Sequence, residues 1–139
     1  MKLLPNFTHR ARVAFVDTDA SGRIHFTAML RYYETAEQEF LRSLGLGHHL
    51  LPPDVGFPRV RVECEYRSAV IFDDQLDISV SVKRVGTTSY TLEFIARKGD
   101  TIAANGGFVV VCVSRARGHA QALPDVFREA LSKSAAIAR

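Results

Sequence analysis

Two acidic side chains, Asp17 and Asp19, stand in a short polar segment just before a long amphipathic stretch. A carboxylate at such a place can do chemistry on a carbonyl group. The unpaired backbone N–H groups at a helix start can polarise the carbonyl oxygen and stabilise a developing oxyanion. The carboxylate can attack the carbonyl carbon, or deprotonate a water that does so. A thioester needs little more, because thiolate is a good leaving group.

The same segment also has a purely structural interpretation, because Asp accepts backbone hydrogen bonds and is common in turns before helices. A calcium site is a further alternative. The EF-hand loop spacing is matched by Asp17, Asp19, Ser21, Gly22 and Ile24. The final ligand should be a glutamate, however, and that position is Ala28. The residues before Asp17 also alternate like a strand, where an EF-hand needs a helix. We therefore expect no calcium.

Hydrophobic periodicity predicts the elements that position this segment. A strand is predicted over residues 8–16, and a helix over residues 27–44. Thr27 can cap the start of the helix, and Gly45 stands where a C-terminal glycine cap is expected. The apolar face of the helix is wide, with spacings of three and four residues. It includes Met29, Tyr33, Ala36, Phe40, Leu41 and Leu44.

Four strands are predicted after this helix. Residues 59–67 alternate, with one apolar face and one charged face. The apolar face is Val60, Val62, Cys64 and Tyr66, and the charged face is Arg59, Arg61, Glu63, Glu65 and Arg67. Residues 76–83 and 90–96 repeat the alternation, with turns at Gly86 and at Lys98-Gly99-Asp100.

The last predicted strand, residues 108–113, is apolar at every position, so both of its faces should be covered. A short C-terminal helix should begin near Pro124. The order of elements predicts an α+β fold, in which a curled five-stranded antiparallel sheet encloses one long central helix. Residues 1–139 contain no repeat, linker or low-complexity tract, and we expect one domain.

Composition sets further bounds. Hydrophobic residues make up 47% and charged residues 24% of the 139 residues, as in ordinary soluble domains. No stretch approaches the roughly 18 apolar residues of a membrane span, and Pro5 interrupts any signal sequence. We expect a cytoplasmic protein with Cys64 and Cys112 as buried free thiols. The net charge of +3 is spread along the chain, so nucleic acid is not an expected partner.

Four stretches together resemble one protein family. They are Asp17-Thr18-Asp19-Ala20-Ser21-Gly22; Tyr33-Glu34 with Phe40-Leu41 and Gly45-Leu46; Gly86-Thr87-Thr88-Ser89-Tyr90; and Val110-Val111-Cys112-Val113 followed by Leu123-Pro124. In order and spacing they resemble the hotdog-fold acyl-CoA thioesterases of the 4-hydroxybenzoyl-CoA thioesterase family, especially the bacterial branch linked to the Tol–Pal system. The resemblance implies a homodimer or homotetramer that hydrolyses acyl-CoA to acid and free CoA, with no cofactor or metal.

The resemblance also assigns roles to residues. The family's catalytic aspartate falls on Asp19, whereas Asp17 matches a turn position. The carbonyl-polarising amide falls on Phe26, and Gly22 suits close approach of the backbone to a substrate carbonyl. The Tol–Pal branch commonly has a catalytic histidine where this chain has Phe26, and His25 stands one place earlier. Structural, substrate-lining and catalytic roles therefore stay open for His25.

Two other functions remain open. A hotdog hydratase or dehydratase needs a positioned histidine, but Asp19 and His25 are one residue too far apart for the usual hydratase spacing. The dehydratase pattern of Gly-His-Phe followed by prolines is absent as well. A non-catalytic acyl-CoA-binding module is the other alternative, and the intact Asp19 argues against it.

Several residues outside the polar segment are secondary candidates. Glu37, near the apolar face of the helix, is the reserve catalytic carboxylate. Lys83 and Arg84 can meet the phosphates of CoA, or they can be solvated residues at a strand end. His48 and His49 have no acid or cysteine at ligand spacing, so we expect a solvated loop and no metal site.

Overall fold

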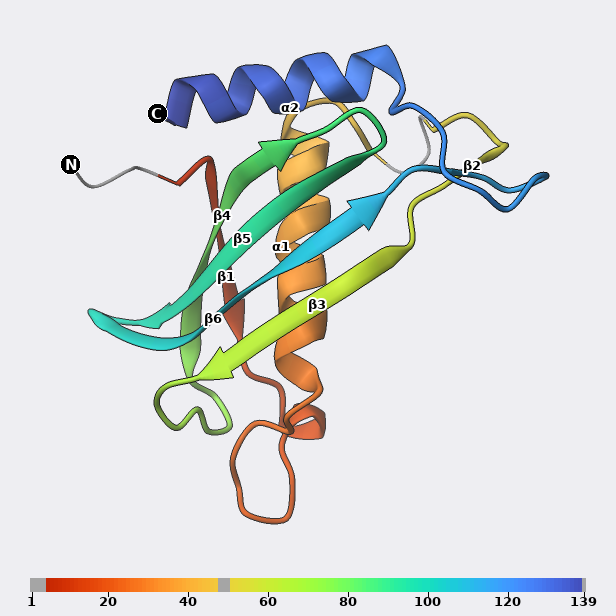
Figure 1. The fold of residues 1–139 in the computed structure, drawn as a ribbon. Helices are drawn as coiled ribbons and strands as arrows, with labels where there is room; N and C mark the ends of the chain where they lie inside the picture. Colours follow the sequence, from red (N-terminus) through yellow and green to blue (C-terminus); the bar gives the residue numbers. More distant parts are fainter. Residues whose placement is uncertain (1–4, 48–50, 139) are drawn as a thin grey trace.

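The computed structural model describes residues 5–47 and 51–138 (Figure 1). Its main sheet has five antiparallel strands in the order β1-β4-β5-β6-β3. These strands are β1 (Phe7–Arg12), β3 (Arg59–Tyr66), β4 (Gln75–Val85), β5 (Ser89–Lys98) and β6 (Thr101–Val111). A small second sheet pairs β2 (Val55–Gly56) with β7 (Val113–Ser114). The predicted α+β class and five-stranded antiparallel sheet are confirmed.

The long helix α1 (Ala28–Ser43) packs on one face of the sheet (Figure 1). Its predicted C-terminal cap is present. Gly45 has a φ of 75°, and its N–H donates to the Arg42 carbonyl at 3.0 Å. The Leu46 N–H donates to the Leu41 carbonyl at 2.8 Å, which completes a Schellman motif.

Thr27 precedes the first residue of α1 as predicted, but its side chain makes no capping hydrogen bond. The Thr27 hydroxyl instead lies 2.8 Å from Nδ1 of His25, and the Thr27 N–H donates to the same nitrogen at 3.2 Å. The imidazole of His25 therefore accepts the hydrogen bond from the backbone N–H of Thr27, the residue that precedes the helix.

The core lies between α1 and the inner face of the sheet. The predicted alternation of β4 and β5 is confirmed, because the inward side chains are almost completely buried. Tyr33 of α1 stacks on Phe94 with ring centroids 4.7 Å apart, and Phe94 contacts Phe108 edge-on at 4.9 Å. The buried strand residues are Leu76, Ile78, Val80, Val82, Tyr90, Leu92, Phe94 and Ala96.

Two predicted strands have different limits. The first strand ends at Arg12, and Phe15–Asp17 forms the short 3-10 helix η1. Phe15 and Val16 are consequently 74% and 84% exposed, although they were predicted to continue the strand. The strand predicted over residues 108–113 instead runs from Thr101 to Val111 and includes two glycines, at 106 and 107.

Gly106 is required where β6 approaches β3. A Cβ atom there would lie 1.9 Å from the carbonyl oxygen of Glu63, which no side chain can tolerate. Residues 108–113 were predicted to be covered on one face by the helix and on the other by a further element or a partner subunit, and cover by a partner stays a prediction. One face is buried, but Val109, Val111 and Val113 are only half-buried.

The edge strand β3 departs most from its prediction. The register shifts between Arg59 and Arg61, so one extra residue bulges out at Val60. The bulge turns Arg59 away from the charged face and toward α1, where it forms an ion pair with Glu37. Val62 and Tyr66, predicted to face the core, are 48% and 45% exposed. Most of the apolar face of β3 is therefore uncovered in the described chain.

The predicted hairpin at Lys98-Gly99-Asp100 is confirmed, with Lys98 paired to Thr101 and a φ of 60° at Gly99. The turn at Gly86 is confirmed by its N–H, which donates to the Ser89 carbonyl at 2.7 Å. Helix α2 (Asp125–Ala138) begins where predicted, but its 14 residues make it nearly as long as α1. It lies across one end of the sheet and packs against β4 (Figure 1).

Candidate active site

The polar segment between η1 and α1 folds into a closed loop. An antiparallel bridge joins Thr18 to Ile24 at its base. Within the loop, the Asp19 N–H donates to the Arg23 carbonyl at 2.8 Å, and the Gly22 N–H donates to the Asp19 carbonyl at 3.0 Å. Gly22 has a φ of 83°, which a side chain would disfavour. We call residues 17–27 the carboxylate loop.

Asp19 is an exposed carboxylate beside the bridge at the base of this loop. Its Oδ1 accepts from the Ser21 hydroxyl at 2.5 Å and from the Ser21 N–H at 2.8 Å. These hydrogen bonds are the main cause of a lowered Asp19 pKa. Its Oδ2 accepts no hydrogen bond from the described residues. Asp19 is therefore ionised, with one oxygen available to a substrate or a water.

Asp17 is a buried carboxylate with both oxygens occupied. Its Oδ2 accepts from the Tyr32 hydroxyl and its Oδ1 from Nη2 of Arg31, both at 2.5 Å. The Tyr32 hydrogen bond, followed by the Arg31 contact, outweighs burial and lowers the Asp17 pKa. Its backbone carbonyl accepts from the His25 N–H at 2.7 Å. Asp17 thus ties the carboxylate loop to the first turn of α1.

Phe26 and His25 lie at the entrance to α1. Among the described residues, the Phe26 N–H has no hydrogen-bond acceptor, while its carbonyl accepts from the Tyr66 hydroxyl of β3. The His25 ring stacks on the Phe26 ring at 4.7 Å. Because Nδ1 of His25 accepts from the Thr27 N–H, a neutral imidazole here carries its proton on Nε2.

The loop thus combines an ionised, exposed carboxylate with an amide donor at a helix N-terminus. This pair can polarise a carbonyl and supply a nucleophile or base. The loop brings together Asp19, Gly22, His25 and Phe26, four of the residues predicted for the site.

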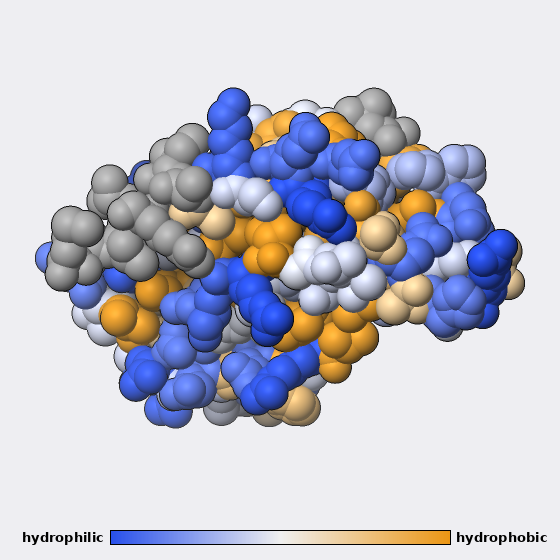
Figure 2. Space-filling model, turned by 45° about the horizontal axis from the view of Figure 1, so that its top comes forward, coloured by the Kyte–Doolittle hydropathy of each residue, from blue (hydrophilic) through white to orange (hydrophobic). Residues whose placement is uncertain are grey.

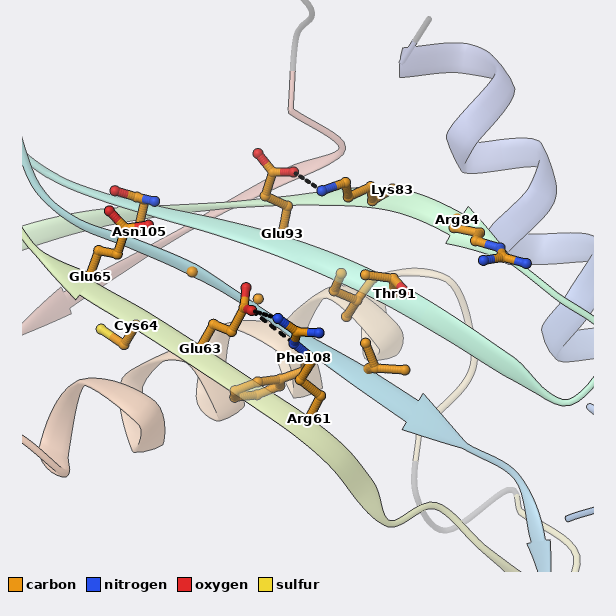
Figure 3. Close-up of a pocket in the computed structure, with 14 residues that line it drawn as sticks. Arg61, Glu63, Cys64, Glu65, Lys83, Arg84, Thr91, Glu93, Asn105 and Phe108 are labelled. Atoms are coloured by element: carbon orange, nitrogen blue, oxygen red, sulfur yellow. Dashed lines mark hydrogen bonds and ion pairs between the residues drawn. The ribbon is translucent and has the colours of Figure 1, made fainter.

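The predicted phosphate-binding pair, Lys83 and Arg84, lies elsewhere. A bulge at Lys83 puts these consecutive side chains on the same outer face of the sheet, where they line a hollow of about 860 Å³ (Figure 3). Lys83 is 3.8 Å from Glu93. The carboxylate loop touches the segment before β4, through the bridge from Arg23 to Ile71. Lys83 stands eight residues beyond the start of β4, roughly 26 Å along the strand.

The reserve carboxylate, Glu37, points into the core. It is fully buried, and its Oε1 accepts from Nη2 of Arg59. Burial raises its pKa, and the ion pair with Arg59 only partly offsets that effect. Glu37 is remote from the carboxylate loop, since it lies in the second half of α1.

Within residues 5–47 and 51–138, no group of three or more His, Cys, Asp or Glu could hold a metal ion. His48 and His49 lie outside the described residues. Cys112 is buried, but Cys64 is only half-buried, contrary to expectation; both are free thiols whose pKa is raised by burial. Neither α1 nor α2 has the length and hydropathy to cross a membrane.

Sequence reasoning missed the residues that position the two carboxylates. The sequence placed Ser21 in a turn and in the EF-hand spacing but did not link it to Asp19, although an Asp two places before a Ser is a pattern for local hydrogen bonding. Arg31 and Tyr32 had no signal linking them to Asp17, since only the fold of the loop brings them together. The same holds for Tyr66, which contacts Phe26 across forty residues of sequence.

Comparison with known proteins identifies the family of the chain. The family model described as Thioesterase-like superfamily matches residues 13–131. An acyl-CoA thioester hydrolase YbgC of Escherichia coli is 29% identical over 85% of this chain and 90% of its own. A 1,4-dihydroxy-2-naphthoyl-CoA hydrolase of Nostoc punctiforme is 27% identical over 86% and 82%. The structure of a gentisyl-coenzyme A thioesterase superposes with a TM-score of 0.82, at 26% identity over 90% and 99%.

Proposed function

The chain belongs to the Thioesterase-like superfamily, and from that premise we propose that it hydrolyses an acyl-CoA thioester to a free acid and CoA. Relatives named as acyl-CoA thioester hydrolase and as 1,4-dihydroxy-2-naphthoyl-CoA hydrolase support this activity. The observation that carries the proposal is the Asp19 carboxylate. It is exposed and ionised, and only one of its two oxygens accepts hydrogen bonds from the described residues. It shares a loop with the Phe26 N–H, which has no acceptor among these residues.

In this proposal the Phe26 N–H donates to the thioester carbonyl oxygen and stabilises the oxyanion that forms on attack. Asp19 either attacks the carbonyl carbon or takes a proton from the attacking water. The CoA thiolate then leaves without a strong general acid. Gly22 lets the backbone approach the substrate, and His25 lines the site beside Phe26.

Two parts of the proposal concern groups outside the loop. Lys83 and Arg84 keep their role with the CoA phosphates, which requires the nucleotide to extend over the outer face of the sheet.

The active form is a homodimer or homotetramer in the cytoplasm, built through β3, whose apolar side chains Val62 and Tyr66 are exposed. In such an assembly α1 is the central helix enclosed by the sheet.

The test is hydrolysis of a panel of acyl-CoAs, with the released thiol detected, by the parent protein and by Asp19→Asn. This substitution keeps the size of the side chain but removes its charge. Loss of a positioned base costs about 10²–10⁴ in rate, so we expect turnover to fall at least about 10²-fold with melting temperature and oligomeric state nearly unchanged.

Asp17→Asn is the matched control, because it removes a carboxylate two residues away whose oxygens are both occupied. Near-full activity of Asp19→Asn on a good substrate would contradict the assigned role. A parent that binds acyl-CoA but never hydrolyses it would indicate a binding module, and hydration of an unsaturated acyl-CoA would indicate a hydratase.

A further inference from the structure

A second polar group is built into the other end of α1. Among the described residues, only three buried side-chain atoms lack a hydrogen-bond partner, and two of them belong to one ion pair. They are Oε2 of Glu37 and Nε of Arg59. A buried carboxylate and guanidinium normally satisfy their remaining hydrogen-bonding capacity, because leaving it unmet costs free energy. This ion pair therefore keeps hydrogen-bonding capacity that a purely structural ion pair would use.

The ion pair adjoins a cavity of about 80 Å³ between α1, the start of β3, β5 and α2. Two of the polar side chains that line it are Arg59, whose side chain is 26% exposed, and Tyr90, which is 2% exposed. Burial and the nearby carboxylate of Glu37 raise the pKa of Tyr90, so its hydroxyl remains a donor. The rest of the wall is mostly apolar, with Leu41, Leu46, Leu51, Phe57, Phe127 and the side chain of Gln38.

The shape and charge of this cavity restrict what it can bind. One water needs only about 10–15 Å³ of such space, and the aromatic and leucine walls gain nothing from water. An anion is disfavoured, because the charge of Arg59 is already paired with Glu37. A neutral hydroxyl fits better. Its oxygen can accept from Arg59 and Tyr90, which line the cavity.

We propose that this cavity is a binding site for a small apolar skeleton that carries one hydroxyl, with Arg59 and Tyr90 holding the hydroxyl and the apolar wall holding the skeleton. The hydroxyl can belong to a free phenol or alcohol, or to the acyl group of a substrate. Phe26 and Glu37 are eleven residues apart, roughly 16 Å along the helix axis. A short acyl group therefore reaches the cavity only if it is bound at the loop of another copy of the chain.

The test uses phenol as the probe and benzene as its counterpart without a hydroxyl, with binding measured by NMR titration of the full chain. Phenol should bind more tightly than benzene. Tyr90→Phe keeps the ring and removes the hydroxyl, so it should weaken phenol about fivefold, the value of one hydrogen bond, and leave benzene unchanged. Leu46→Phe fills the cavity and should abolish binding of both.

Tyr33→Phe is the matched control. Tyr33 is also a buried tyrosine, but it lies on α1 and does not line the cavity. It should leave the affinity for phenol unchanged. Equal binding of phenol and benzene, or no effect of Leu46→Phe, would mean that the cavity holds water only and would overturn the proposal. If Tyr90→Phe does not fold, the phenol–benzene difference and Leu46→Phe still decide the question.

A second arm identifies the source of the hydroxyl, and this arm alone rests on the proposed function. Hydrolysis of 4-hydroxybenzoyl-CoA and benzoyl-CoA is compared with and without phenol. If the acyl group supplies the hydroxyl, Tyr90→Phe lowers the kcat/KM ratio of the two substrates, and phenol competes with the hydroxylated one. If a free molecule supplies it, the ratio stays constant while phenol still binds. A protein without any thioesterase activity would leave the binding result intact.

Discussion

Asp17 and Asp19 are two residues apart, yet their surroundings give them different chemistry. Asp17 is buried and bonded on both oxygens, whereas Asp19 is exposed and bonded on one. Both have a lowered pKa, from Tyr32 and Arg31 in one case and from Ser21 in the other. The free oxygen, more than the pKa, therefore separates the candidate catalyst from the structural residue.

Ser21→Ala should alter the pH profile of hydrolysis. The Ser21 hydroxyl is the largest cause of the lowered Asp19 pKa, so its loss should raise that pKa. In the proposed mechanism the rate depends on the ionised carboxylate, so Ser21→Ala should lose activity at a higher pH than the parent as the solution is acidified. The measurement is kcat/KM from pH 4 to 8 for the parent and Ser21→Ala. An acid limb that does not move would show that Asp19 is not the group that titrates.

Asp17→Asn should mainly reduce stability. Hydrogen bonds to a charged group contribute about 1.5–3 kcal/mol, and two of them hold this carboxylate. Because the folded pKa is lowered, the stabilisation is present above the unfolded pKa and is lost as pH falls through the folded pKa. Urea unfolding should show a large difference between parent and variant near pH 7 that shrinks toward pH 3. A difference independent of pH would contradict a role for the charge.

At the scale of elements, bulges and glycines decide which side chains reach the site and the core. The bulge at Val60 sends Arg59 to Glu37, and the bulge at Lys83 puts Lys83 and Arg84 on one face. A strictly alternating strand would give neither result. These irregularities explain why the predicted strand faces hold for β5 but fail at the start of β3.

Gly106→Ala tests how tightly β6 is matched to β3. The added methyl group would meet the Glu63 carbonyl at 1.9 Å, so the strands must separate. We expect a loss of about 1–3 kcal/mol or more, as overpacking typically costs, measured by urea unfolding. Gly86→Ala is the control, because its nearest contact is the movable Ser89 hydroxyl at 3.3 Å. Equal effects of the two substitutions would contradict the close approach.

At the scale of the whole molecule, the apolar residues left exposed are informative. Figure 2 turns the top of Figure 1 toward the viewer. On the face that it shows, hydrophilic residues surround limited apolar areas. Strand β3 is different, because Val60, Val62 and Tyr66 are 61%, 48% and 45% exposed on an edge that has only one partner strand. An unpaired apolar edge favours pairing with another chain.

We therefore predict a homodimer whose sheet continues through β3. Val62→Asp should weaken it, because the substitution places a charge on the paired edge. Light scattering at micromolar concentration should give at least twice the chain mass for the parent and a lower mass for the variant. Val126→Asp on α2 is the control, since that side chain is 62% exposed and far from β3 in sequence. A stable monomeric parent would contradict the prediction.

The sequence by itself determined the features that depend on local periodicity. The extent of α1, its glycine cap at Gly45, the inward faces of β4 and β5 and the hairpin at Gly99 all follow from spacings within about ten residues. The polar loop with Asp19 before the helix was also visible. Its catalytic role came partly from a family resemblance, because the pattern alone favours a structural turn over a catalyst.

Only the tertiary structure decided which distant groups meet. The ion pair of Glu37 with Arg59 spans 22 residues, and the hydrogen bond of Tyr66 to Phe26 spans 40. It also decided that Arg84 lies far from the carboxylate loop. Such contacts depend on strand order and on bulges, which shift every following side chain by one position. Periodicity cannot register an inserted residue, because the pattern of apolar residues looks continuous across it.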